Sequence, residues 1–373
     1  MKKIAFYLPQ FHEIEENNEW WGKGFTEWTN VKKTKSLFSG HDQPRVPINN
    51  DYYDLSNVSV MDHQAQLARK YGIDGFCFYH YYFKDGKTLL EKPLENFLSS
   101  TIDLEYCFCW ANESWTRNWD GKNKKVLIQQ DYGNRIDWLK HFDYMLKYFS
   151  DNRYIKLKNK PIFLIYKIED IPLYNQFSEY WNELAINNGF DGIEFVAVQR
   201  QKESTLPSEY SVSYSVAFEP FYSLSSTDSL SKYYKFNGGL FKSVAIKSYD
   251  ILTSMSYQLG LRGSLAIDYQ KIVDQSIDNQ KIASSSLLPG CFVDWDNSPR
   301  RGVKGIIFKG FTSTVFGDYV QSIFKIAEKE NKPFVFINAW NEWAEGTYLE
   351  PDQKNGYSVL EAVYRASNAS KGI

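Results

Sequence analysis

The sequence repeats one local pattern along its length: a short apolar run stops at polar and aromatic residues, and a helix-like segment follows. The last of these runs, residues 334–339, changes at once into two tryptophans and two glutamates, Trp340, Glu342, Trp343 and Glu345. Apolar runs of roughly four to eight residues with polar boundaries are typical of strands buried in a parallel sheet. A chain built from such runs, with helices between them, has few folds open to it.

The strand-like and helix-like segments alternate. We expect strands near residues 4–9, 74–83, 105–113, 161–167, 193–200, 212–220, 287–294 and 334–339. We expect helices at residues 58–71, 89–98, 134–149, 174–188, 319–330 and 357–370, and a further one around 241–255. This alternation implies a parallel sheet, and about eight units favour a closed barrel over an open doubly wound sheet. We therefore predict an α/β fold, a single (β/α)8 TIM barrel with long βα loops that occupies residues 1–373 as one domain.

Aromatic residues make up 17% of the chain, and many of them stand beside Asn, Asp, Glu or Arg. Flat rings edged with hydrogen-bonding groups suit sugars, which have apolar C–H faces and hydroxyl rims; the alternative is an aromatic-rich core and surface. The net charge of −2 gives no reason to expect a nucleic-acid partner. No run approaches the roughly 18 apolar residues of a membrane span. We expect a sugar-binding protein with an oligosaccharide or polysaccharide substrate.

The four cysteines, Cys77, Cys107, Cys109 and Cys291, all lie inside apolar runs, where a free thiol packs as a small hydrophobe. The N-terminal apolar run is short and reaches Pro9 without a small-residue cleavage site, so it reads as a first strand rather than a signal peptide. These features favour a cytoplasmic setting.

Residues 10–30 show little periodicity and read as one long loop. A loop of this length in a compact fold is usually functional or disordered, and its tryptophans argue against disorder. The candidates for a site within it are Gln10, His12, Trp20, Trp21, Glu27 and Trp28.

Polar and aromatic residues follow several predicted strands at the same end. In a (β/α)8 barrel the carboxyl ends of the strands form one face, which carries the active site. We therefore expect these residues to converge. The predicted substrate-binding residues are His12, Trp28, His80, Tyr82, Trp110, Asn112, Glu113, Trp115, Asp294, Trp295, Asp296, Trp340, Asn341 and Trp343.

Glu342 and Glu345 are the predicted catalytic pair. Three positions apart, they would point to opposite sides of a continuing strand but would be neighbours in a helical turn. Either the strand stops near Trp340 and the chain turns, or only one glutamate faces the site. Two close carboxylates cannot both ionise freely, so one can act as an acid while the other stays a base. Glycoside cleavage needs this asymmetry.

Other chemistries have weaker support in the sequence. His12, His80, Asp294 and Asp296 could supply metal ligands, but no paired-histidine spacing is present. No Gly-x-Ser-x-Gly nucleophile motif and no Gly-rich phosphate loop occurs. We expect neither a metal nor a cofactor.

Several longer motifs resemble one known family. They are residues 5–12, Trp20-Trp-Gly-Lys-Gly-Phe-Thr-Glu-Trp-Thr-Asn30, residues 71–76, 90–94 and 110–115, Trp295-Asp-Asn-Ser-Pro-Arg300 and Asn338-Ala-Trp-Asn-Glu-Trp-Ala-Glu-Gly346. Together they look like the WbsX-type family, whose members are labelled glycosyltransferases and whose domain is similar to glycoside hydrolase family 99, the endo-α-mannosidases. The resemblance runs from Ala5 to about Asp352 and leaves residues 202–286 without a matching motif.

The resemblance implies a (β/α)8 barrel and a retaining reaction. One carboxylate of a Glu-x-x-Glu pair helps the substrate 2-hydroxyl attack C1, which gives a 1,2-anhydro sugar, and the other acts first as acid and then as base. Matched to this sequence, Glu342 would assist the 2-hydroxyl and Glu345 would be the acid/base. The resemblance also implies a role in surface polysaccharide metabolism, of O-antigen or capsule.

Three functions remain open from the sequence. The first is an enzyme that hydrolyses or transfers a glycosidic bond with the Glu342–Glu345 pair. The second is a nucleotide-sugar-dependent glycosyltransferase, for which Asp294-Trp-Asp296 is the only Asp-x-Asp triplet in the strand-end regions. The third is a carbohydrate-binding barrel without catalysis. The sugar, the linkage and the oligomeric state do not follow from the sequence.

Overall fold

A computed structural model describes residues 1–117, 125–202, 210–225 and 266–370. Parallel strands form its central sheet, in the order β12-β10-β9-β8-β4-β2-β1-β15-β13. In chain order these strands are β1 (Lys2–Tyr7), β2 (Gly75–Tyr82), β4 (Glu105–Trp110), β8 (Lys160–Ile165), β9 (Glu194–Gln199), β10 (Tyr214–Ala217), β12 (Leu287–Leu288), β13 (Gly290–Phe292) and β15 (Phe334–Asn338).

The sheet closes on itself between its two ends. β12 pairs with β10 and β13 pairs with β15, and along the chain only Pro289 separates β12 from β13. Proline lacks the N–H that a strand interior needs, which accounts for the interruption. Its carbonyl still accepts the N–H of Phe336 at 3.0 Å. The predicted (β/α)8 barrel is confirmed.

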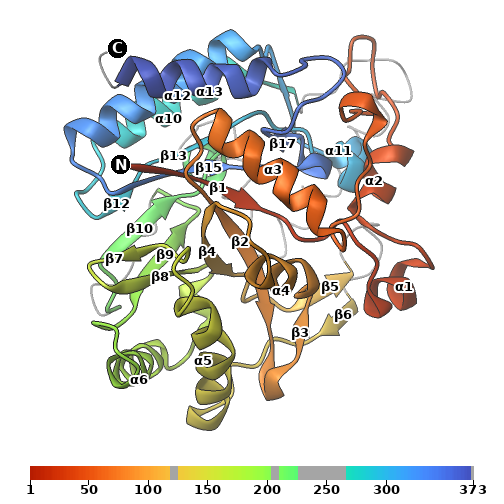
Figure 1. Cartoon of the computed structure of the whole chain (residues 1–373). Coiled ribbons are helices and arrows are strands. Elements are labelled where there is room, and N and C mark those ends of the chain that lie inside the picture. The colour runs from red at the N-terminus through yellow and green to blue at the C-terminus, as the bar shows by residue number, and fades with distance from the viewer. Residues whose placement is uncertain (118–124, 203–209, 226–265, 371–373) are drawn as a thin grey trace, which may run out of the picture.

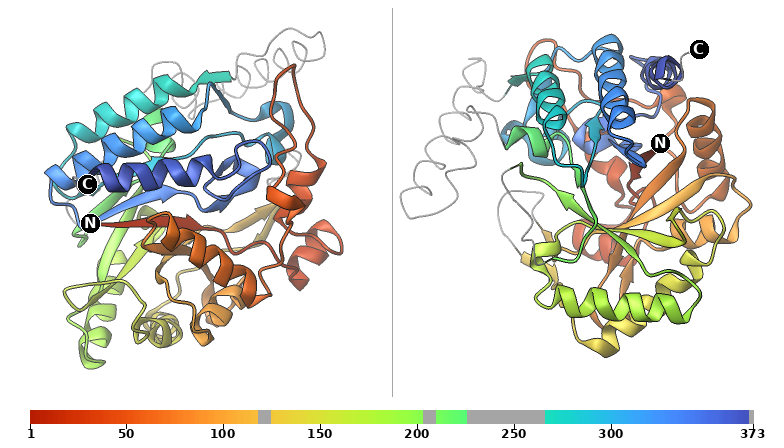
Figure 2. Two further views of the ribbon diagram at one scale, coloured as in Figure 1. Left: turned by 45° about the horizontal axis from the view of Figure 1, so that its top comes forward. Right: turned by 90° about the vertical axis from the view of Figure 1, so that its left-hand side faces the viewer.

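Helices surround the barrel (Figure 1). They are α1 (Glu15–Trp21), α2 (Glu27–Lys33), α3 (Val58–Lys70), α4 (Lys92–Ser99), α5 (Arg135–Phe149), α6 (Tyr174–Asn187), α7 (Phe221–Leu224), α10 (Tyr269–Lys281), α11 (Ser298–Arg301), α12 (Ser313–Lys329) and α13 (Ser358–Ser370). α10, α12 and α13 lie together on one side of the barrel, while α5 and α6 lie on the opposite side of the barrel (Figure 2).

Several helices begin where the sequence offers a side-chain cap. The side chain of Asn57 accepts the Ser59 N–H at the start of α3, and Asn134 forms a capping box with Asp137 at the start of α5. Such caps satisfy backbone donors that the helix itself leaves unpaired. This local chemistry explains why these predicted helices are confirmed close to their expected boundaries.

The prediction of one irregular loop over residues 10–30 is wrong. The segment contains α1 and α2, and the second begins with a capping box formed by Thr26 and Thr29. Each helix has only seven residues, so neither is long enough to show a periodic apolar pattern. The helix expected around residues 241–255 lies outside the described residues.

The connections between the barrel strands contain short strands of their own. β5 (Trp115–Arg117) and β6 (Lys125–Ile128) form an antiparallel pair after β4, and β16 (Asn341–Glu342) pairs with β17 (Thr347–Tyr348) after β15. β11 (Ala266–Asp268) pairs with β14 (Ile307–Lys309), while β3 (Thr88–Leu89) and β7 (Lys156–Leu157) extend β2 and β8. The long βα loops that the sequence predicts therefore contain structured parts.

The barrel core is rich in aromatic side chains. Phe6 lies against Phe336 and, edge to face, against Phe218, with ring centroids 5.6 and 5.2 Å apart. The four cysteines are buried and free, as expected. No helix among the described residues has both the length and the apolar character needed to cross a lipid bilayer.

Candidate active site

The turn after β15 brings the two predicted catalytic glutamates to one face. β15 ends at Asn338, and the chain passes through β16 into a single 3-10 turn, Trp343–Glu345. Gly346 closes this turn with φ of 69°, a conformation that favours glycine. The strand therefore stops before Trp340, and Glu342 and Glu345 both line the same cleft.

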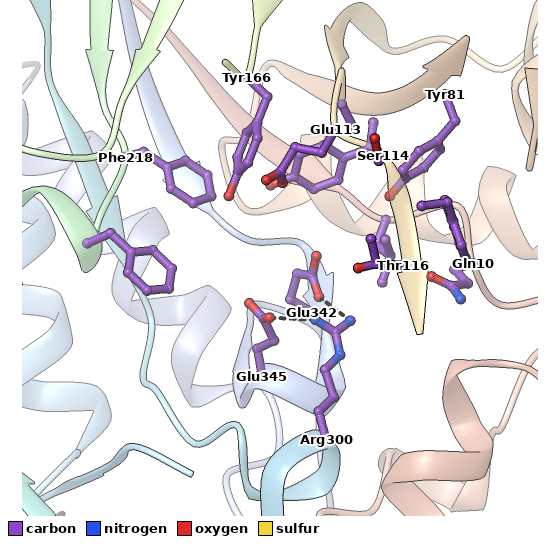
Figure 3. A pocket seen from close by; sticks show the side chains of 15 residues that line it. Gln10, Tyr81, Glu113, Ser114, Thr116, Tyr166, Phe218, Arg300, Glu342 and Glu345 are labelled. Carbon is purple, nitrogen blue, oxygen red and sulfur yellow. Dashed lines mark hydrogen bonds and ion pairs between the residues drawn. The ribbon is translucent and has the colours of Figure 1, made fainter. Parts of the chain in front are cut away.

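One arginine joins the two glutamates (Figure 3). The Nη2 of Arg300 donates to Glu342 at 3.2 Å, and its Nη1 donates to Glu345. Arg300 lies in α11, directly after β13, where Asp296 accepts the Ser298 N–H at 3.0 Å. The guanidinium thus bridges the carboxylates from a neighbouring barrel strand.

A third carboxylate holds Arg300 from the other side. Glu27, the first residue of α2, accepts a hydrogen bond from the Nε of Arg300 at 3.0 Å, and its side chain has no exposed surface. Its backbone N–H donates to the carbonyl of Gln10 at 3.1 Å. Segments far apart in the sequence therefore meet at one guanidinium group.

Burial dominates the electrostatics of this cluster. It raises the pKa of Glu342 to about 8; Arg300 opposes that rise, whereas the negative charges of Glu345 and Glu27 add to it. Burial also raises the pKa of Glu27, again against the effect of Arg300. For Arg300, burial favours the neutral form, but the three carboxylates hold its pKa well above the ordinary value. At neutral pH Glu342 is mostly protonated, and Arg300 stays charged.

The cleft in front of these groups has a volume of about 290 Å³. Figure 3 shows the glutamates and Arg300 on one side, with Tyr81, Ser114 and Thr116 facing them across the opening. The lining residues are Leu8, Gln10, Tyr79, Tyr81, Ala111, Glu113, Ser114, Trp115, Thr116, Tyr166, Phe218, Phe221, Arg300, Glu342 and Glu345. Aromatic rings and hydroxyl or amide groups thus surround a carboxylate pair, an arrangement that fits a sugar.

Among the predicted substrate-binding residues, Glu113 and Trp115 line the cleft. The side chain of Glu113 pairs with Lys167 at 2.7 Å, and Trp115 packs edge to face on Tyr81. The other predicted residues are buried around the cleft and do not line it. They are His12, Trp28, His80, Tyr82, Trp110, Asn112, Asp294, Trp295, Asp296, Trp340, Asn341 and Trp343.

Some of these buried residues hold the cleft-lining segments in place. Asn341 accepts the N–H of Leu8 at 2.7 Å and donates to its carbonyl at 3.0 Å, which ties the turn after β15 to the end of β1. Asn112 makes the same kind of exchange with the backbone of Lys167, at 2.8 and 2.6 Å. Because Glu113 follows Asn112, this exchange also places Glu113 at the rim.

The predicted aspartates after β13 bind side chains from the segment of residues 41–45. Arg45 donates to Asp294 at 2.7 Å and to the Gly346 carbonyl at 2.8 Å. Asp296 lies 2.8 Å from the Nε2 of His41 and accepts from Gln43 at 2.7 Å. Both aspartates therefore brace the two turns that carry Arg300 and Glu345.

The predicted histidines and several aromatic residues serve packing. His80 faces His141, with Nε2 atoms 2.9 Å apart, and the ring of Tyr82 stacks on His141 at 3.9 Å. His12 contacts the Pro9 carbonyl at 3.0 Å through its Nδ1. Among the described residues, no three His, Cys, Asp or Glu side chains gather as a metal site.

Trp28, Trp110, Trp295, Trp340 and Trp343 are likewise packed against protein. Trp28 donates to the Tyr53 carbonyl, Trp110 to the Tyr82 carbonyl and Trp343 to Glu350. Trp340 packs on Phe76, and Trp295 on Phe221, which itself lines the cleft. Of these indoles, Trp295 therefore lies directly behind a cleft-lining side chain, and the others pack within the protein interior.

The sequence reasoning missed Arg300 as a site residue, although Arg300 ends one of the motifs on which the family resemblance rests. Its position after the polar end of a predicted strand was the available signal. Of the unranked candidates from residues 10–30, Gln10 lines the cleft and Glu27 lies behind it. Tyr81, Ser114, Thr116, Tyr166, Phe218 and Phe221 were also missed.

Comparison with known proteins settles the family. The model of the family described as Glycosyltransferase WbsX matches residues 3–363. The chain belongs to the WbsX glycosyltransferase family. This membership places it among carbohydrate-active proteins.

Two relatives of this WbsX family member come from Xanthomonas campestris pv. campestris and are both described as uncharacterized protein WxcX. The one from strain ATCC 33913 is 37% identical over 368 residues, and the one from strain B100 is 36% identical over 373 residues. Each match covers 97% of this chain and 49% of the relative. The chain therefore spans about half the length of the curated relatives it matches.

Solved structures of similar fold include the GH99 endo-alpha-mannosidase from Bacteroides thetaiotaomicron in complex with BIS-TRIS-Propane. That comparison has a TM-score of 0.59 and 12% identity, and it covers 100% of this chain and 97% of the other. A glycoside hydrolase-like protein matches with a TM-score of 0.57 and 12% identity over 98% of this chain and 93% of the other. At this identity the likeness shows the fold alone, a TIM barrel.

Proposed function

We propose that this protein is an enzyme that cleaves or transfers a glycosidic bond with retention, using Glu342 and Glu345 as its carboxylate pair. The observation that carries the proposal is the shared position of the two groups. Both come from one turn at the carboxyl end of a barrel strand, both line one cleft, and both bind Arg300. Aromatic rings such as Trp115 and Tyr166 line the same cleft and can cover the apolar face of a sugar.

The two carboxylates differ in their surroundings, as acid–base chemistry requires. The side chain of Glu342 is 8% exposed and that of Glu345 is 25% exposed. Burial raises the pKa of Glu342 to about 8, so the ligand-free cleft keeps a proton on Glu342 at neutral pH. Glycoside cleavage uses two carboxyl groups in different roles, and a difference in their surroundings supports this division.

The family resemblance assigns the acid/base role to Glu345 and the assistance of the 2-hydroxyl to Glu342. For these roles a bound sugar has to favour the ionised form of Glu342. A 2-hydroxyl that donates a hydrogen bond to Glu342 has this effect. We propose the roles on this basis.

Transfer from a sugar nucleotide is the second candidate, and the charges of the cleft oppose it. Among the described residues, the acidic and basic side chains that line the cleft are Glu113, Glu342, Glu345 and Arg300, and Arg300 already donates hydrogen bonds to carboxylates. A diphosphate would therefore have to compete with Glu342 and Glu345 for Arg300. Asp294 and Asp296 are buried against Arg45 and His41, away from the cleft lining.

The family supports an oligosaccharide or polysaccharide as substrate. We place the reaction in the metabolism of surface polysaccharides, O-antigen or capsule, and in the cytoplasm.

The decisive experiment incubates the purified protein with a panel of defined oligosaccharides and reads the products by mass spectrometry. Glu342→Gln and Glu345→Gln should each lower kcat/KM by about 10²–10⁴-fold. Glu361→Gln, an exposed glutamate on α13, is the matched control and should behave as wild type. Full turnover in either of the first two variants would contradict the assignment. Glycan binding without turnover in wild type would support a non-catalytic barrel instead.

A further inference from the structure

Arg300 occupies a position that acid–base catalysis by two glutamates does not by itself explain. Three of its nitrogens each serve a different carboxylate: Nε serves Glu27, Nη1 serves Glu345 and Nη2 serves Glu342. The planar guanidinium holds its donors in a fixed fork, so these contacts set the carboxylates relative to each other. A lysine ammonium, a point charge on a flexible stem, could not span them.

Glu27 supplies the support for this fork. Its side chain is completely buried, whereas the side chain of Arg300 is 17% exposed at the cleft. Only one of the Glu27 carboxylate oxygens makes a hydrogen bond, to Arg300; the other, Oε2, is buried without a partner. A buried carboxylate of this kind is costly unless a charge pairs with it. The pairing therefore keeps Arg300 directed at the cluster.

We infer that Arg300 is a positioning residue for Glu342 and Glu345, and that Glu27, although outside the cleft, holds Arg300 in place for this task. This inference rests on the proposed function, because it assigns a purpose to the contacts of the carboxylate pair. According to this inference, the positions of the two carboxylates depend on α2 and α11, two segments that are far apart in sequence.

The charged and titratable groups around Glu342 define what a test can measure. Arg300 faces Glu342 from α11, and Glu27 faces it from α2. Glu345 faces it from the same turn after β15, and Tyr79 and Tyr81 face it from β2. Glu27→Gln takes away a negative neighbour, which by itself favours the ionised form of Glu342, and it also releases Arg300, which favours the neutral form. Arg300 has the larger effect on the pKa of Glu342. Because the inference has Glu27 hold Arg300 in place, the titration of Glu342 in Glu27→Gln should move to higher pH.

The titration is read without any substrate. Protein labelled with ¹³C at the glutamate side-chain carboxyl is titrated by NMR, and the Glu342 signal is assigned by its loss in Glu342→Gln. Glu27→Gln keeps the shape of the side chain, and Arg301→Gln, a change at an exposed arginine of the same short helix, is the matched control. A Glu342 midpoint in Glu27→Gln that equals that of wild type and Arg301→Gln, or that lies at lower pH, would show that Arg300 keeps its place without Glu27 and would overturn the inference.

Kinetics give a second readout. Arg300→Lys should lower kcat by about 10²-fold and change KM far less, because misplaced catalytic groups slow the chemical step. It should also alter the pH profile of kcat, whereas Arg301→Gln should not. An unchanged kcat and pH profile in folded Arg300→Lys would overturn the positioning role. If wild type turns over no glycan, the proposed function fails while the titration still reports on Arg300 and Glu27. If turnover depends on Glu342 but the titration does not move, only the inference fails.

Discussion

The backbone N–H of Asp296 donates to the carbonyl of Glu345 at 2.8 Å and joins the turn after β13 to the turn after β15. One turn leads into α11 and Arg300, and the other carries both glutamates. The geometry of the candidate active site therefore depends on how closely two neighbouring βα connections approach each other. We therefore expect residues that keep this approach short to affect the proposed activity without touching a substrate.

Gly346→Ala tests the close approach. Gly346 has a positive φ, and a Cβ built on it would lie 2.8 Å from the Asp296 nitrogen. The substitution combines backbone strain with a clash against backbone, so we expect a loss of stability of about 2–3 kcal/mol and a large loss of activity. Gly356→Ala is the control, because Gly356 also has a positive φ but nothing lies near its added Cβ. Chemical denaturation should show the larger loss for Gly346→Ala; equal losses would mean that the contact with Asp296 is unimportant.

Asp296→Asn tests the brace beneath Arg300. Burial opposes the ionised form of Asp296, but hydrogen bonds from His41 and Gln43 and the charge of Arg45 outweigh it and lower its pKa to about 2. Asp296 thus stabilises the fold above the ordinary pKa of an aspartate, and this contribution is lost as pH falls toward about 2.

The free energy of unfolding of Asp296→Asn should be about 2–4 kcal/mol lower than that of wild type at neutral pH. The reason is that the buried partners of Asp296 no longer face a negatively charged carboxylate. Asp278→Asn is the control, since Asp278 is exposed and its bond to Lys281 lies at the surface. Urea unfolding at pH 7 measures both. The structural account of Asp296 does not survive if the two variants lose the same stability.

The alternation of strands and helices could be predicted because each segment carries its own pattern. The apolar run of β15 and the cap of α5 are local features, readable without knowing the fold. The carboxylate pair was predicted for a similar reason, since Glu342 and Glu345 stand three apart at a strand end. The short α1 and α2 lack such a signal, so the sequence pattern predicts a loop there.

The finer composition of the cleft could not be predicted, because side-chain direction is a tertiary property. Trp340 and Trp343 stand beside the predicted catalytic glutamates in the sequence, yet both indoles point into packed protein. Arg300 is 42 residues from Glu342 and 273 residues from Glu27 in sequence, and only the closed barrel brings the three together. A polar-aromatic strand end therefore indicates where the site lies but not which side chains face it.

Glu342→Gln should change the pH dependence of stability. The folded pKa of Glu342 is raised to about 8, so the folded protein binds this proton more tightly than the unfolded chain. Glu342 therefore contributes to the free energy of unfolding at pH values below its pKa in the unfolded chain. This contribution declines as pH rises toward about 8, by up to about 1.4 kcal/mol per pH unit. Glutamine cannot ionise, so the variant should gain stability relative to wild type between pH 5 and 8 on the order of that slope.

The difference between the two proteins isolates Glu342 from the other buried carboxyl groups with raised pKa, which include Glu27, Glu219, Asp294 and Glu350. Thermal unfolding of wild type and variant across this pH range measures it, with Glu361→Gln as control. Parallel Tm curves for wild type and Glu342→Gln would show that Glu342 titrates normally in the folded state.

The roles of the two glutamates can be separated with aryl glycosides of graded leaving-group acidity, once the sugar is known. A general acid matters least when the leaving group departs without a proton. With Glu345 as acid/base, Glu345→Gln should recover most of its bond-cleavage rate on the most acidic phenols, while Glu342→Gln should stay slow on all of them. Pre-steady-state release of the phenol measures this step directly. The reverse pattern would assign the acid role to Glu342, the group that holds the proton in the free cleft, and would mean that a bound sugar leaves that proton in place.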